Sequence, residues 1–331
     1  MTPGVYHSMP MADYLRLPTF SSSLVSAIVD RCPAAAWFES YLNPKRRPDA
    51  DDEAGDEGED ADDDNTHASD LGTVAHSLLL EDDRSKVVVL DPREFVGKRG
   101  GIPKGFTNEA IRAARDEAQA AGKTPILLSR MIEAEAMAAA GRAFIGSLRD
   151  TEPAVWRAFQ RDAGFSELTM IWNDDGIPCR LRADRIASDY SVIVDAKFTG
   201  LSAHPDAWGR SQLSRMGYHR SAAFYRRGVE AQCGVQPAYL FLVVETAPPY
   251  LCALVGLEPQ TLELAAQQCE YALGVWRDCI AADHWPGYPT RAAYPELPAW
   301  EFARWQERMS GDEQHGHPFD LDQVFKRKEA A

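Results

Sequence analysis

The sequence predicts an α/β protein with a central mixed β-sheet flanked by helices. Four strand-like segments are followed by a helix, two further strands and a long helix, and this order fits a mixed sheet covered by helices. Of the 331 residues, 45% are hydrophobic and 10% aromatic, which is ordinary for a globular chain with a sizeable core.

Helices are expected at the start of the chain. SSSLVSAIVDR (21–31) places serines before apolar residues at helical spacing, and CPAAAWFESYL (32–42) is entered through a proline. DLGTVAHSLLLED (70–82) is an apolar helix, and the Ala-rich segments 107–121 and 129–147 are also helical.

The strands lie in the second half of the chain. We predict strands at 154–160, 165–172, 179–187 and 191–197, then a helix at 217–232, strands at 238–245 and 250–257, and a long helix at 259–283.

An acidic block interrupts this pattern. Residues 49–64 hold eleven acidic side chains in sixteen positions, so only −4 of the net charge of −15 belongs to the rest of the chain. Such a block repels itself and is expected to be disordered; an acidic decoy that competes with DNA for a basic groove is the alternative. The predicted organisation is an N-terminal helical part (1–48), an acidic loop (49–66), a core (67–300) and a polar tail (301–331).

Cell location follows from features that the sequence lacks. The N-terminus has no basic segment followed by an apolar one, and the most apolar run, YLFLVV, is far shorter than a membrane span. The six cysteines are scattered, without a CxxC pair, which favours reduced thiols. We therefore expect a cytoplasmic protein without a membrane partner.

The segment CRLRADRIASDYSVIVDAKFTG (179–200) carries the candidate chemistry. Alternate residues of a strand share a face, so Asp195 and Lys197 point the same way. Asp184 shares a face with Arg180 and Arg182 in the preceding strand, and ASDY is compatible with a turn. The simplest geometry is an antiparallel hairpin with both carboxylates on one surface.

Two neighbouring carboxylates require a cation or a proton between them. Mg²⁺ is typically held by carboxylates, and an adjacent lysine can place a water or neutralise charge on a phosphate. The alternative is a solvated strand edge with a surface ion pair worth ~0–1 kcal/mol. The hairpin alone favours this alternative.

His76 is a third candidate. In the helix 70–82, Gly72, Thr73 and His76 fall on one face. A lone histidine on an apolar helix is more often a satisfied core residue, and His76 becomes a candidate ligand only together with the two aspartates.

These motifs together resemble those of the PD-(D/E)XK nuclease superfamily. GTVAH on a helix, a strand pair with Asp and Asp-Ala-Lys, and SAAFY on a later helix occur in the superfamily's order. More narrowly, the chain resembles the RecE-type exodeoxyribonuclease VIII group, which is related to the RecB nuclease domain and lambda exonuclease. The resemblance runs from SSSLVSAIVDRCPAAAWF to the late WPGYP and LPAW segments, covers most of the chain and implies a restriction-endonuclease-like core at 67–300.

The resemblance implies a role for each matching residue. His76, Asp184, Asp195 and the carbonyl of Ala196 would be metal ligands, with two Mg²⁺ or Mn²⁺ ions per site. Lys197 would orient or deprotonate the attacking water, or stabilise charge on phosphorus.

Four further residues have open alternatives. Glu167 matches a frequently acidic position and lies either behind the ligands or on a soluble strand edge. Tyr225 matches the tyrosine of a Q-x-x-x-Y helix, although this chain has Ser221 in place of the glutamine, and core packing is the alternative. Arg180 and Arg182 are candidate contacts to the DNA backbone, or structural partners of nearby carboxylates.

The function implied by the resemblance is a Mg²⁺-dependent double-strand DNA exonuclease. It would degrade one strand 5′ to 3′, leave a 3′ overhang for a single-strand annealing protein, form a ring-like homo-oligomer and come from a phage or bacterium. The alternatives are a catalytically inactive DNA-binding protein of the same fold, or an endonuclease or nickase. Some relatives bind an iron–sulfur cluster, but the cysteines after Cys32 are too widely spaced for one, and we predict no cluster.

Overall fold

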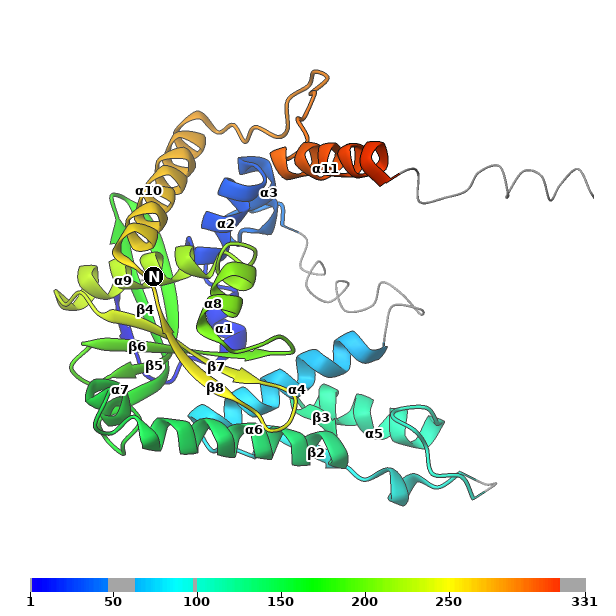
Figure 1. Cartoon of the computed structure of the whole chain (residues 1–331). Helices are drawn as coiled ribbons and strands as arrows, with labels where there is room; N and C mark the ends of the chain where they lie inside the picture. Colours follow the sequence, from blue (N-terminus) through cyan, green and yellow to red (C-terminus); the bar gives the residue numbers. More distant parts are fainter. Residues whose placement is uncertain (1, 47–62, 98–99, 316–331) are drawn as a thin grey trace, which may run out of the picture. The chain divides into compact units, whose positions relative to one another are not determined.

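The computed structural model describes residues 2–46, 63–97 and 100–315 (Figure 1). The chain divides into two units, Met1–Gly287 and Tyr288–Ala331. The candidate residues of the previous section all belong to the first unit, which contains every strand of the described residues.

A six-stranded mixed sheet forms the centre of the first unit, in the order β1-β4-β5-β6-β7-β8. The strands are β1 (Gly4–Tyr6), β4 (Gly164–Asp174), β5 (Ile177–Ala187), β6 (Val192–Thr199), β7 (Ala238–Glu245) and β8 (Cys252–Gly256). β6 and β7 are parallel and the other neighbours antiparallel. The predicted fold class is therefore confirmed.

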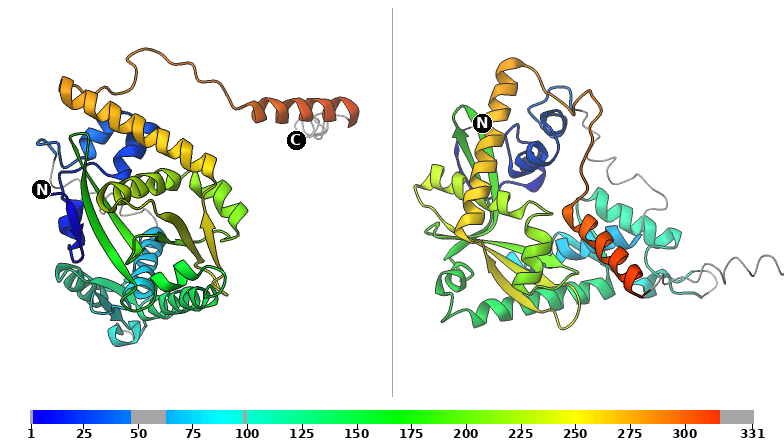
Figure 2. Two further views of the ribbon diagram at one scale, coloured as in Figure 1. Left: turned by 90° about the vertical axis from the view of Figure 1, so that its left-hand side faces the viewer. Right: turned by 45° about the horizontal axis from the view of Figure 1, so that its top comes forward.

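Helices cover both faces of this sheet (Figures 1 and 2). One face packs against α2 (Ser22–Asp30), α3 (Pro33–Glu39), α9 (Tyr218–Cys233) and α10 (Pro259–Ala282). The other face packs against α4 (Asp63–Leu80), α6 (Leu128–Ser147) and α7 (Pro153–Ala158). The remaining helical segments are α1 (Met11–Leu15), η3 (Pro92–Phe95), α5 (Glu109–Ala120), α8 (Pro205–Trp208) and η4 (Gly209–Leu213) in the first unit, and α11 (Ala299–His315) in the second.

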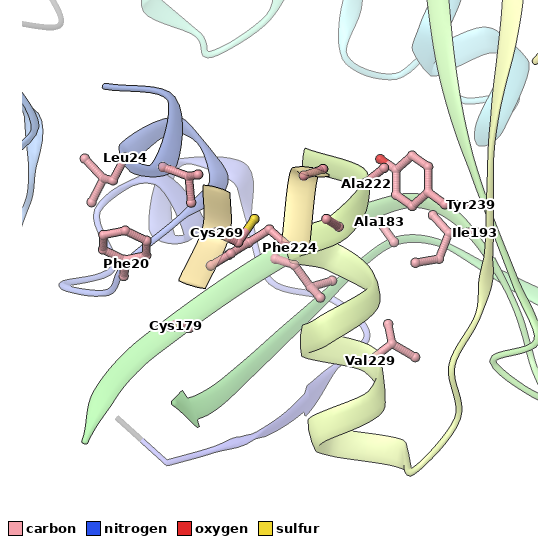
Figure 3. Close-up of a cluster of buried hydrophobic side chains, with 14 of the residues drawn as sticks. Phe20, Leu24, Cys179, Ala183, Ile193, Ala222, Phe224, Val229, Tyr239 and Cys269 are labelled. Carbon is pink, nitrogen blue, oxygen red and sulfur yellow. The ribbon is translucent and has the colours of Figure 1, made fainter. Parts of the chain in front are cut away.

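The crossover between the parallel strands passes through α9, which lies close to the sheet. Trp172 and Phe224 are fully buried at this contact, with ring centroids 5.0 Å apart (Figure 3 labels Phe224). Burying an aromatic side chain of this size contributes about 1.5–3 kcal/mol. Gly228 permits the approach, because a Cβ there would lie 2.6 Å from side-chain atoms of Trp172 and Leu181.

A second, two-stranded parallel sheet lies beside α5. It consists of β2 (Val87–Leu90) and β3 (Thr124–Leu127) and packs Leu90 and Ile111 into a small apolar cluster. Both strands are four residues long, too short for alternation to reveal them in the sequence.

Two predictions differ from the structure, and the predicted polar tail contains a helix. Residues 154–160 were expected to form a strand, but α7 occupies this region because Pro153 starts a helix in which Val155 and Ala158 are buried at helical spacing. The predicted polar tail begins with α11. The predicted loop 49–66 lies outside the described residues up to position 62, and residues 63–66 already belong to α4.

The remaining predicted helices and strands of the core are present, with boundaries shifted by a few residues. None of the described helices combines the length and apolar character needed to span a membrane.

Candidate metal centre and active site

Asp184, Asp195, Lys197 and Tyr225 line a cleft of about 330 Å³ at the place where β5 and β6 separate. The other predicted site residues with side-chain roles, His76, Glu167, Arg180 and Arg182, are not part of its lining. Its lining comes from α2, β5, β6, the segment before α9, α9 itself and β7: Ser22, Ser23, Ser26, Asp184, Asp195, Lys197, Met216, Tyr218, Ser221, Tyr225 and Tyr239. Residues far apart in the sequence thus share one small cavity.

The two aspartates are placed by the hairpin. The β5–β6 register pairs Arg185 with Val194, and beyond this pair the Asp184 side chain replaces a strand partner, because its Oδ2 accepts a hydrogen bond of 2.9 Å from the Ala196 N–H. Asp184 and Asp195 both line the cleft, as strand alternation predicts. Asp195 is only 7% exposed, so the interpretation as a solvated edge is wrong for this hairpin.

A group of three potential ligands stands at the edge of this cleft. His76 Nε2 lies 3.0 Å from Asp184 Oδ2, and His76 Nδ1 lies 3.7 Å from Glu167 Oε1. One donor atom from each of the three residues falls within 4.8 Å of the others, the kind of spacing that a single metal ion needs. His76 reaches the group from α4, whose Val74, Ala75 and Leu78 are buried against the sheet.

Glu167 occupies a more direct position than the sequence indicated. The β4–β5 register pairs Ser166 with Arg185 and Leu168 with Ala183, so that Glu167 stands opposite Asp184. Its φ of +54° is rare for a residue with a side chain, and such backbone strain gathers at functional sites. Arg182 donates a 2.5 Å hydrogen bond to Glu167 Oε2 and holds the carboxylate in place.

Asp195 is held by two donors. Lys197 Nζ lies 2.5 Å from its Oδ1, and the Tyr239 hydroxyl donates to its Oδ2 at 2.8 Å. The Lys197 ammonium also lies 5.0 Å from the centre of the Tyr218 ring, a distance typical of a cation–π contact.

The pKa values of the two aspartates are shifted in opposite directions. Burial, together with the neighbouring charge of Asp184, raises the pKa of Asp195 to about 6 despite the opposing charge of Lys197. For Asp184, burial also disfavours the charged form, but the hydrogen bond and positive charge of His76 outweigh it and lower its pKa. This asymmetry is expected where two carboxylates share a site.

The pKa values of both basic groups are raised. Burial disfavours the charge of Lys197, yet Asp195 and Asp184 outweigh it and raise its pKa. Burial likewise opposes the imidazolium of His76, but the hydrogen bond to Asp184 and the charges of Asp184 and Glu167 raise its pKa.

The helix α9 brings Ser221 and Tyr225 into the same cleft, one turn apart. Tyr225 is also packed edge-on against Tyr239, with ring centroids 6.1 Å apart. It therefore both lines the cleft and packs in the core.

The two arginines differ in their surroundings. Arg182 donates hydrogen bonds to the Glu167 carboxylate and to the carbonyl of Met9. Arg180 donates to the carbonyl of Leu17 but also lines a second cleft of about 800 Å³, which shares Ser23 with the first. The carbonyl of Ala196 remains a predicted ligand.

Sequence reasoning assigned no role to Tyr239, Tyr218 or Met216, although all three line the cleft. Tyr239 reaches the cleft because the β6–β7 register places this residue beside Ile193. No local pattern could reveal a contact that depends on this strand pairing.

The model of the family described as a PDDEXK-like domain of unknown function (DUF3799) matches residues 50–298. No curated protein matches the chain.

Among solved structures, the chain is similar to a putative exonuclease from Eubacterium rectale, with 11% identity and a TM-score of 0.48 over 89% of this chain and 98% of the other. It is also similar to SSO0001, with 10% identity and a TM-score of 0.24 over 63% of this chain and 85% of the other. Because both TM-scores are below 0.5, the family assignment rests on the family model.

Proposed function

The chain belongs to the PDDEXK-like domain family, whose model spans residues 50–298, and from this premise we propose that it is a metal-dependent nuclease that hydrolyses double-stranded DNA from its ends. The observation that carries the proposal is the placement of His76, Glu167 and Asp184 in one ligand group, next to the cleft residues Asp195 and Lys197.

The donor set fits a divalent metal ion. Two carboxylates and one imidazole within 4.8 Å offer mostly oxygen ligands, which suit Mg²⁺ or Mn²⁺. We propose that Asp195 is a further ligand beside this group. We also propose that the site holds two ions. When bound, the metal would supply Lewis acidity and neutralise negative charge on the phosphate.

The side chains of the chain divide the remaining work. Asp184 and Asp195 provide negative charge, while His76 and Arg182 hold Asp184 and Glu167 in position. Lys197, kept as an ammonium by Asp195 and Asp184, is suited to hold the attacking water or to donate a hydrogen bond to a phosphate oxygen as charge develops there. Tyr225 and Ser221 would line the path of the substrate.

The second cleft supports DNA as the substrate. It is lined by Arg16, Arg46 and Arg180, and it meets the catalytic cleft at Ser23. Arginine suits phosphate geometry, and backbone contacts position a duplex without reading its sequence. The strand to be cut would thus lie across both clefts.

Three finer features of the proposed activity rest on the resemblance seen in the sequence. They are 5′-to-3′ polarity, a 3′ overhang that a single-strand annealing protein accepts, and a ring-like homo-oligomer that encircles the duplex. A closed ring requires head-to-tail interfaces, and sedimentation at micromolar concentration would reveal it.

The test compares a linear duplex, labelled separately at its 5′ and 3′ ends, with a covalently closed circle, each incubated with the protein and Mg²⁺. We expect early release of the 5′ label from the linear DNA, an intact circle, and loss of all cleavage with EDTA.

Asp195→Asn and Lys197→Ala should each lower the rate by about 100-fold or more, because each removes charge that the transition state needs. Asp116→Asn on α5, an exposed carboxylate outside the cleft, is the matched control and should cleave normally. Cutting of the circle would identify an endonuclease, whereas binding of DNA without cleavage would identify an inactive DNA-binding protein.

A further inference from the structure

Tyr239 is a buried residue whose hydroxyl enters the catalytic cleft. It lies near the start of β7 and is only 5% exposed. Because β7 runs parallel to β6, with Tyr239 beside Ile193, its side chain reaches along the sheet toward Asp195 (Figure 3 shows Tyr239 and Ile193). The hydroxyl donates a hydrogen bond of 2.8 Å to Asp195 Oδ2.

This hydrogen bond completes the support of the Asp195 carboxylate. Its other oxygen, Oδ1, lies 2.5 Å from Lys197 Nζ, so each oxygen has its own donor. A carboxylate with a single donor can rotate about its Cβ–Cγ bond, whereas donors on both oxygens define its plane. A phenol also donates without adding positive charge, and so leaves the carboxylate able to bind a cation.

The ring that carries this hydroxyl is itself fixed by packing. It contacts Tyr225 at a centroid distance of 6.1 Å and an interplanar angle of 76°, and Phe241 at 5.3 Å and 61°. Tyr239 also belongs to the buried core cluster on this face of the sheet. The donor is therefore held before any ligand arrives, which is what a precise site requires.

We propose that Tyr239 is a positioning residue, whose hydroxyl sets the orientation in which Asp195 meets a metal ion beside His76, Glu167 and Asp184. The inference rests on the proposed function, since it assigns Asp195 to the metal. Groups that orient metal ligands typically change metal affinity or activity by about 10–100-fold when removed.

The test is Tyr239→Phe, which deletes the hydroxyl and keeps the ring. Mn²⁺ affinity is measured by calorimetry, kcat and KM by cleavage of linear duplex, and Tm by circular dichroism. We expect Mn²⁺ affinity and kcat to fall by about 10-fold or more, with KM for DNA unchanged and Tm lowered by no more than about 4 °C. Tyr271→Phe on α10, where the tyrosine is 62% exposed, is the matched control and should behave as wild type.

A double-mutant cycle decides whether Tyr239 acts through Asp195. In the Asp195→Ala background, Tyr239→Phe should cause no further loss of Mn²⁺ affinity. The proposal would be overturned if Tyr239→Phe lowered Mn²⁺ affinity equally in both backgrounds. It would also be overturned if Tyr239→Phe alone kept wild-type Mn²⁺ affinity and kcat.

The same measurements separate this inference from the proposed function. A wild-type protein that binds Mn²⁺ but cleaves no DNA would refute the nuclease, while the cycle on Mn²⁺ affinity would still decide the role of Tyr239. Absence of Mn²⁺ binding to the wild type would overturn both.

Discussion

At the scale of single residues, His76 is a position where a proton and the proposed metal ion would compete. Asp184 and Glu167 stabilise the imidazolium more than burial destabilises it, so the pKa of His76 is raised. A metal ion binds only the neutral imidazole and must displace this proton. Below the raised pKa, each ion therefore releases a proton when it binds.

We accordingly predict that Mn²⁺ affinity rises with pH until the pH exceeds the pKa of His76. One released proton corresponds to about tenfold in affinity per pH unit. His76→Asn should bind Mn²⁺ more weakly but with a shallower pH dependence in calorimetric titrations, and His204→Asn, which changes an exposed histidine, should retain the wild-type slope. An unchanged slope in His76→Asn would contradict the assignment of His76 as a ligand.

Glu167 combines backbone strain with a candidate ligand. Its φ of +54° costs free energy that glycine would not incur, on the order of 1 kcal/mol or more. The carboxylate, held by Arg182, lies within the ligand group. The backbone strain at Glu167 therefore coincides with a carboxylate that is proposed to bind the metal ion.

Two substitutions at this position separate strain from ligation. Glu167→Gln keeps the strained backbone, and Glu167→Gly relieves it, while both remove the carboxylate. We expect both to lose Mn²⁺ affinity, and Glu167→Gly to be at least as stable as Glu167→Gln in urea denaturation without metal. A glycine variant less stable by more than about 1 kcal/mol would show that the backbone here is not strained.

At the scale of elements, the approach of α9 to the sheet places Tyr225 and Ser221 in the cleft. Gly228 lies on the buried side of this helix, where a Cβ would contact Trp172 and Leu181 at 2.6 Å. Gly274 lies within α10, where a Cβ would have no neighbour within 4 Å. The two glycines therefore serve as a matched pair.

Replacement by alanine should have opposite effects at the two positions. In a helix interior, alanine is favoured over glycine by about 1 kcal/mol, so Gly274→Ala should stabilise the protein. At Gly228 the overpacking costs about 1–3 kcal/mol or more and should outweigh that gain. Urea denaturation would measure both, and a stabilised Gly228→Ala would mean that α9 can move away from the sheet at little cost.

At the scale of the whole molecule, the nuclease-like unit ends at Gly287. Both halves of its core and every residue that lines the candidate active-site cleft precede this point. The last helix to contribute to the core is α10, through Leu273 and Trp276 among others.

Truncation after residue 287 should therefore leave a folded protein that binds Mn²⁺ and cleaves DNA ends. Truncation after residue 270 is the control, because it removes Leu273 and Trp276 and leaves a large apolar surface uncovered, and it should not fold. Circular dichroism and thermal melting would compare the two. A 1–287 protein without a cooperative transition would show that residues 288–331 are needed for folding.

Much of this architecture was accessible from residue patterns. The alternation in 179–187 and 191–197 predicted β5 and β6, and helical spacing in 70–82 and 217–232 predicted most of α4 and α9. The short strands β2 and β3 and the helix α7 were missed, because four to six residues carry too little periodicity to distinguish strand from helix.

By itself, the sequence indicated the PD-(D/E)XK superfamily, through its resemblance in Gly-Thr-x-x-His, Asp and Asp-x-Lys, and it supplied the main candidate residues, because these are local patterns that each element displays on one face. Only the tertiary structure decided that Glu167 joins His76 and Asp184, that Arg182 holds Glu167, and that Tyr239 holds Asp195. These contacts depend on strand register and on helix packing against the sheet, which bring His76 next to Glu167 and Asp184, 91 and 108 positions further along the chain. Such long-range pairing is set by the burial of the whole core rather than by any local pattern.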